Sequence, residues 1–199
     1  ASSTDTTAYN PDFQVYSIKD TATDRTYFKV TSSTGHFPTI TSSYYHEVYE
    51  DSKWNLAVRI RPQEHPFSSY VTSSVSASFE FYGVNMDHGV VVNEFDLSQL
   101  MPAASASLFT TVANKRFYIG ANRQNFTGSL VDKSDVRFST FRCWADYLTA
   151  EEIQYHAKDP SNYGRKTPDR NSFVWEGNIG FLHVPRIDSL ALNWDFTTV

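Results

Sequence analysis

The sequence predicts an all-β protein, a two-sheet antiparallel sandwich with one short helix near residues 150–157. Three observations support this prediction. Segments with alternating apolar and polar residues recur along the chain, and turn-forming residues separate them, which is typical of antiparallel strands. Ser and Thr are plentiful while Lys, Leu and Met are sparse, and this composition favours strands over helices. A single capped helix then follows the run of strands.

Length and composition limit the kind of protein. The 199 residues suit one sandwich domain of ordinary size, and a hydrophobic content of 40% with 12 Tyr and 15 Phe supplies a core. A net charge of -5 gives no electrostatic reason to expect nucleic acid as a partner. Because no apolar run approaches the roughly 18 residues of a membrane span, we expect no membrane insertion. The single cysteine, Cys143, permits no internal disulfide and is expected to be buried.

The first half of the chain reads as a lead-in followed by hairpins. Residues 1–12 are expected to be flexible, and residues 13–188 to form the sandwich. Phe13, Val15 and Ile18 indicate a first strand and residues 27–30 a second, with turn chemistry between them. Residues 53–61 form the clearest strand, because its apolar side chains alternate with polar ones until Pro62 ends it.

Further strands follow in order. Residues 79–84 and 89–95 are predicted to form a hairpin joined by residues 85–88. Residues 97–112 read as a loop with a helical turn. Strands are then expected at residues 117–120, 128–131, 135–144, 173–175, 179–184 and 190–196, with residues 189–199 either closing the sandwich or opening a following module.

The helix has clear start and stop signals. Thr149 as N-cap and Glu152 three residues later make a capping box, while Leu148 and Ile153 are spaced for a hydrophobic staple. Asp159 and Pro160 end the segment.

These segments, in this order, resemble the laminin G-like domains of the concanavalin A-like superfamily. Residues 53–58 (KWNLAV) look like the family's Trp-led alternating strand, and residues 118–120 (YIG) look like its glycine-ended strand. Residues 134–138 (SDVRF) followed by 148–153 (LTAEEI) are similar to its strand-plus-helix ending, whereas residues 1–52 lack the pattern. The resemblance implies a jelly-roll sandwich used for attachment to glycans, proteins or matrix, a module that also recurs in virion structural proteins.

The resemblance also raises an enzymatic alternative. Glucanases of this fold place alternating carboxylates on one strand, so that all of them project into one cleft. Glu94 and Asp96 have this spacing, but Ser98 or Gln99 stands where the last carboxylate is needed. A glycoside hydrolase using Glu94 and Asp96 therefore stays the alternative to a non-catalytic module, and the six scattered histidines show no metal-ligand spacing.

Loops between strands are the expected location of a binding site. Amide, carboxylate and imidazole groups at two predicted tips can pair with sugar hydroxyls, and an exposed Trp can stack on a sugar ring. The candidate ligand-binding residues are Asn85, Asp87, His88, Asn122, Arg123, Asn125 and Trp175. Asp20 and Asp24 are weaker candidates for Ca²⁺, since no dense acidic loop supplies about six oxygen ligands.

The function expected from the sequence is a non-catalytic, lectin-like attachment module. Its partners would be glycans or neighbouring structural subunits, and its location a virion or another extracellular surface. A purely architectural role as a capsid or fibre decoration domain is a further alternative. We expect no cofactor.

Overall fold

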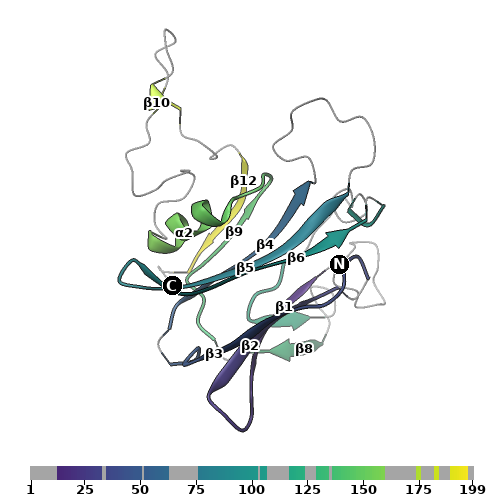
Figure 1. The fold of residues 1–199 in the computed structure, drawn as a ribbon, viewed down its shortest axis with the longest axis vertical. Helices are drawn as coiled ribbons and strands as arrows, with labels where there is room; N and C mark the ends of the chain where they lie inside the picture. Colours follow the sequence, from purple (N-terminus) through teal and green to yellow (C-terminus); the bar gives the residue numbers. More distant parts are fainter. Residues whose placement is uncertain are drawn as a thin grey trace. The chain divides into compact units, whose positions relative to one another are not determined.

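The computed structural model shows a protein built mainly of antiparallel strands (Figure 1). It describes residues 13–32, 35–50, 52–62, 76–102, 104–106, 117–123, 129–134, 136–159, 174–175, 182–183 and 189–196. The early elements are β1 (Gln14–Lys19), β2 (Arg25–Thr31), β3 (Ile40–His46), β4 (Trp54–Pro62), β5 (Ala77–Asp87), β6 (Val90–Met101) and β7 (Ala121–Arg123). The later ones are β8 (Leu130–Lys133), β9 (Thr140–Trp144), α2 (Ala150–Lys158), β10 (Val174–Trp175), β11 (Leu182–His183) and β12 (Leu190–Asp195).

The chain divides into two compact units. The first contains residues 1–48, 60–81 and 97–137, and the second contains residues 49–59, 82–96 and 138–199. Strands β4, β5 and β6, which pair in that order, each contribute residues to both units. Residues 1–12, expected to be a lead-in, lie outside the described residues.

The opening hairpin predicted from the sequence is confirmed. In the first unit β1 pairs with β2 and β2 pairs with β3, both antiparallel. The β2–β3 register shifts between Tyr27 and Lys29, and there the Phe28 N–H donates to the Ser42 hydroxyl oxygen at 2.9 Å. The side-chain bond therefore satisfies a backbone donor at a β-bulge, where the ladder is interrupted.

The core of the first unit is rich in phenylalanine. Phe28 and Val30 of β2 are fully buried, as are Phe79 and Phe81 of β5. Phe37, between β2 and β3, stacks on Phe79 with ring centroids 3.6 Å apart. This apolar side fixes which face of the β1-β2-β3 sheet turns toward the interior.

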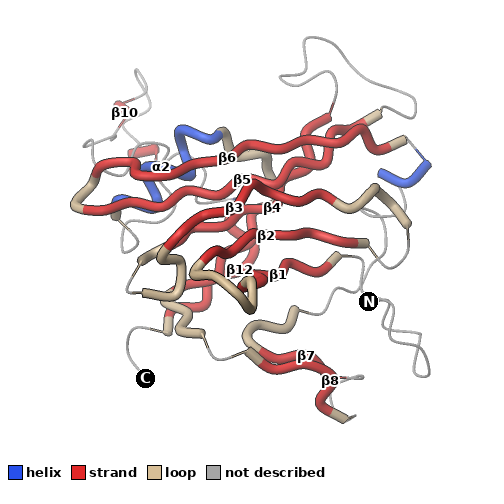
Figure 2. Tube along the Cα trace, turned by 60° about the horizontal axis from the view of Figure 1, so that its bottom comes forward, coloured by secondary structure: helices blue, strands red, loops and turns tan. Residues whose placement is uncertain are grey.

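The β5–β6 hairpin turns later than its sequence suggests. The sequence places the joint at residues 85–88, but β5 continues through Asp87 and only His88 and Gly89 form the turn (Figure 2). Both have positive φ, 48° and 80°. Two-residue hairpin loops of this kind need two left-handed residues, and their twist matches that of the flanking strands. The turn chemistry therefore lies at His88-Gly89, and Asn85 stays within the strand.

Helix α2 begins as predicted and ends at Lys158, one residue later than expected. Thr149 accepts from the Glu152 N–H, and the Glu152 carboxylate accepts in return from the Thr149 N–H at 2.8 Å. Leu148 and Ile153, the predicted staple, both belong to the buried apolar cluster of the second unit. That cluster joins the helix to β5 through Tyr82, Val84, Leu148, Ile153 and Ala157.

Three other predictions need correction. Residues 117–120, predicted to be a strand, are not one, and β7 begins only at Ala121. The predicted strand 135–144 is strand only from Thr140, and Val136 and Phe138 are exposed instead of packed. Residues 97–101, expected to be loop, extend β6, while residues 104–106 are helical as expected. Strand β12 pairs antiparallel with β9, and a register shift lies between Leu190 and Leu192.

Replacing Gly83 with Ala should destabilise the protein by about 2 kcal/mol, because the core has no room for a methyl group. A Cβ there would overlap ring carbons of Phe95 and lie 3.0 Å from a Leu56 methyl. Urea unfolding measures the change. The Phe95→Leu background removes the ring atoms that clash, so Gly83→Ala should cost less in that background. Equal costs in both backgrounds would contradict this packing account.

Stability should fall as the pH drops from 6.5 to 4, because His156 is held neutral. Its side chain is buried, with 6% of the residue exposed, and it packs on Trp144. Burial, helped by nearby Arg142 and opposed by Asp159, lowers the pKa of His156 to about 4. Between pH 6.5 and pH 4 the histidine of the unfolded chain is protonated while that of the folded chain stays neutral. Acidification through this range therefore lowers the free energy of unfolding by about 3 kcal/mol, and raising the pH above 6.5 restores it.

Urea unfolding at pH 7.0 and pH 4.5 measures this loss. His156→Gln should reduce the difference in the free energy of unfolding between the two pH values, whatever its effect on stability at either pH. His88→Gln, at an exposed histidine, is the matched control and should leave the difference unchanged. A wild-type pH dependence retained in His156→Gln would refute the assignment.

Candidate functional site

The candidate binding surface lies on the outward side of the β1-β2-β3 sheet in the first unit. Along β2, the side chains of Thr26, Phe28 and Val30 are buried. The residues that alternate with them, Arg25, Tyr27 and Lys29, are only partly buried. Successive side chains of a strand point to opposite faces. The buried set therefore forces this second set onto the other side of the sheet.

The strand register extends this outward side across all three strands, because directly paired residues share a face. On β2, Lys29 is paired with Tyr16 of β1 and with Thr41 of β3. Tyr27 is likewise paired with Ile18 of β1 and with Tyr44 of β3. Arg25 is paired with His46 of β3. We call these residues the tyrosine face: Tyr16, Ile18, Arg25, Tyr27, Lys29, Thr41, Tyr44 and His46.

The aromatic centre of the tyrosine face is a pair of tyrosines. Tyr27 and Tyr44 meet edge to face, with ring centroids 5.3 Å apart and an interplanar angle of 70°. Tyr44 is 51% exposed. Because two rigid strands carry the two rings, they are ordered before any ligand arrives, which lowers the entropic cost of binding.

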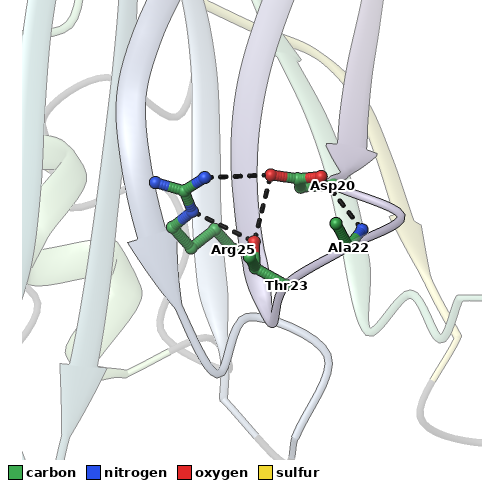
Figure 3. Close-up of polar contacts among 4 residues, drawn as sticks. All are labelled: Asp20, Ala22, Thr23 and Arg25. Atoms are coloured by element: carbon green, nitrogen blue, oxygen red, sulfur yellow. Dashed lines mark hydrogen bonds and ion pairs between the residues drawn. The ribbon is translucent and has the colours of Figure 1, made fainter.

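Arg25 is held in place by residues of the β1–β2 turn (Figure 3). Its Nη2 donates to Asp20 Oδ2 at 3.0 Å, and its Nε donates to the Thr23 hydroxyl oxygen at 3.0 Å. The guanidinium carbon lies 4.8 Å from the centroid of the Tyr44 ring, a cation–π arrangement. Hydrogen bonds to the Asp20 carboxylate lower its pKa; the bond from the Ala22 N–H has the largest effect, and those from Arg25 and Thr23 come next.

Glu94 and Asp96, the carboxylates of the enzymatic alternative, lie in the second unit. Arg59 Nη2 donates to both oxygens of Asp96 at 2.9 Å. The Arg59 side chain is only 5% exposed, and its guanidinium carbon lies 5.1 Å from the Tyr82 ring centroid and 5.4 Å from that of Tyr147. Asp96 therefore compensates a buried cation that aromatic rings surround.

Glu94 is engaged by helix α2. Gln154 Nε2 donates to Glu94 Oε2 at 2.8 Å and to the Tyr82 hydroxyl oxygen at 3.0 Å. Burial is the main cause that raises the pKa of Tyr82. In the structure, the two carboxylates thus connect β6 to Arg59 and to helix α2.

The predicted tip residues of the β5–β6 hairpin separate into two environments. Asp87 and His88 lie at the turn, highly exposed, with Asp87 Oδ1 2.7 Å from His88 Nδ1. Asn85 is buried, and its Nδ2 donates to the Lys53 carbonyl oxygen at 3.0 Å. The Asn85 amide thus serves a backbone group, because the strand extends past it.

The other predicted binding residues are located only in part. Asn122 and Arg123 belong to β7 and Trp175 to β10, but the described structure does not include their side chains, and Asn125 lies outside the described residues. Among the other tryptophans, Trp54 packs near Phe95 and Trp144 near His156, whereas Trp194 is partly exposed.

Metal and thiol chemistry find little support within the described ranges. No group of three or more His, Cys, Asp or Glu side chains that could hold a metal occurs there. Asp20 is bound to Arg25, and Asp24 lies 3.2 Å from the Lys19 ammonium, so both carboxylates proposed for Ca²⁺ already have a cationic partner. Burial raises the pKa of the Cys143 thiol. Among the described helices, none has the length and apolar character needed to cross a bilayer.

Sequence reasoning missed the tyrosine face, because strand β3, which carries Thr41, Tyr44 and His46, was not predicted. The available signal was the alternation in residues 25–30, where cationic and aromatic side chains interleave with apolar ones. Comparisons of the chain with protein-family models, with curated proteins and with solved structures give no match. The residues themselves therefore carry the functional argument.

Replacing Asp96 with Ala should destabilise the protein by about 2 kcal/mol. The buried Arg59 would lose its charged partner, but the Asp96 side chain is 47% exposed, so the cost is below that of a fully buried pair. Asp87→Ala, at the exposed turn, is the matched control and should change stability by less than about 0.5 kcal/mol. Equal effects of the two substitutions in thermal and urea unfolding would rule out the anchoring role.

Proposed function

We propose that the chain is a non-catalytic attachment module that binds glycans through the tyrosine face. The observation that supports this is the ordered Tyr27–Tyr44 pair with Arg25 stacked on Tyr44. A pyranose ring presents an apolar C–H face that packs on an aromatic ring, while its hydroxyls seek donors and acceptors at the rim. The tyrosine face offers both, since polar residues border the two rings.

The carboxylate arrangement favours this reading over hydrolysis. A glycosidase needs one carboxyl as general acid and a second as nucleophile or base, both aimed at the sugar. Asp96 is bound at both oxygens by Arg59, and Glu94 accepts from Gln154. These bonds give each carboxylate a structural task in the second unit.

The proposal extends to the fold family and the setting. The antiparallel, β-rich architecture suits the laminin G-like, concanavalin A-like jelly roll that the sequence resembles. Attachment to glycans places such a module on a virion or another extracellular surface, where glycans are displayed. If the module binds no glycan, the alternative is that it attaches to neighbouring structural subunits.

A glycan array followed by calorimetric titration of its hits tests the proposal. Tyr44→Ala should weaken binding by about tenfold because it removes the exposed ring of the pair. Tyr49→Ala, at an exposed tyrosine outside the tyrosine face, is the matched control and should bind as the wild type does. The proposal fails if no glycan on the array binds, or if the two variants behave alike.

A further inference from the structure

Several nitrogen donors on the tyrosine face have no hydrogen-bond partner among the described residues. Among the described residues, Arg25 Nη1 makes no hydrogen bond, since only Nε and Nη2 of its guanidinium are engaged. Neither the Lys29 ammonium nor the His46 imidazole makes a hydrogen bond or ion pair within the described ranges. Three donors are therefore available to a ligand on one side of one sheet.

None of the residues of the tyrosine face is acidic. Asp20 is the acidic residue beside the tyrosine face, and its two oxygens accept from Ala22, Thr23 and Arg25. Glu47 follows His46 but has left the strand, with a φ of 57°. Asp20 thus compensates Arg25, and Lys29 is the cation of the tyrosine face without an ion-pair partner among the described residues.

The spacing of the cations fits a short ligand. Arg25 and Lys29 are four residues apart on β2, which is about 13 Å along the strand, and Tyr27 stands midway between them. A sugar ring over the Tyr27–Tyr44 pair would therefore have a cation on either side. Two cations cannot support a long polyanion, whose binding depends on many phosphate or sulfate contacts.

We infer that the tyrosine face binds a short acidic oligosaccharide, with a sugar ring on Tyr44 and its carboxylate or sulfate at Arg25 or Lys29. This inference rests on the proposed glycan-binding function and names the ligand class. Arg25 suits the acidic group because its planar fork is held in place by Asp20 and Thr23 before binding. The available charges thus select among glycans that the two rings alone would not distinguish.

Titration with three matched probes tests the inference: sialyllactose, sulfated lactose and lactose. At least one acidic probe should bind about tenfold more tightly than lactose, and 0.5 M NaCl should weaken only the acidic probes. Lys29→Gln should weaken the bound acidic probe by about fivefold and should weaken lactose by a smaller factor, because the glutamine keeps a hydrogen-bond donor but loses the charge.

Lys19→Gln is the matched control, because it removes the same charge from the opposite face of the same sheet and should leave binding unchanged. Lactose binding equal to that of both acidic probes would overturn the acidic preference and leave the glycan-binding function intact. Equal losses in Lys29→Gln and Lys19→Gln would overturn the assignment to this face. Failure of every glycan on the array would remove both proposals.

Discussion

The burial of one side of β2 is the constraint on which the proposed function depends. Phe28 and Val30 contribute to the core of the first unit, so Tyr27 and Lys29, which alternate with them, must point away from it. A slip of one residue would turn Tyr27 and Lys29 inward and bring the phenylalanine to the surface. An unpaired buried ammonium costs several kcal/mol, so the hydrophobic core holds the tyrosine face in register.

The second unit shows the same constraint acting on a cation. Arg59 lies on the β4 side that packs toward helix α2, and burial there requires charge and hydrogen-bond partners. Asp96 supplies the charge and two hydrogen bonds, and the Leu148 carbonyl oxygen accepts from Arg59 Nη1 at 3.4 Å. The Tyr82 and Tyr147 rings add cation–π contacts. A carboxylate whose spacing suggests catalysis is thus bound at both oxygens by the buried arginine of a neighbouring strand.

Rigid strands, and not flexible tips, carry the groups of the proposed binding surface. Hairpin tips adapt to ligands, but ordering them costs conformational entropy. In the tyrosine face the rings stand on paired strands, and a turn that three side-chain bonds close holds the guanidinium. Such preorganisation suits the weak individual contacts that sugars make, because little of the contact energy is lost in ordering the protein.

The sequence by itself determined the local structure: the opening hairpin, the strand that begins at Trp54 and the capping box at Thr149 and Glu152. These follow from period-two alternation and from bonds between neighbouring residues, which act over a few positions. Only the tertiary structure decided that Asp96 meets Arg59, 37 positions away, and that Tyr27 meets Tyr44 across a bulged ladder. Register and long-range pairing depend on how whole strands bury their apolar sides together, and no local pattern contains that information.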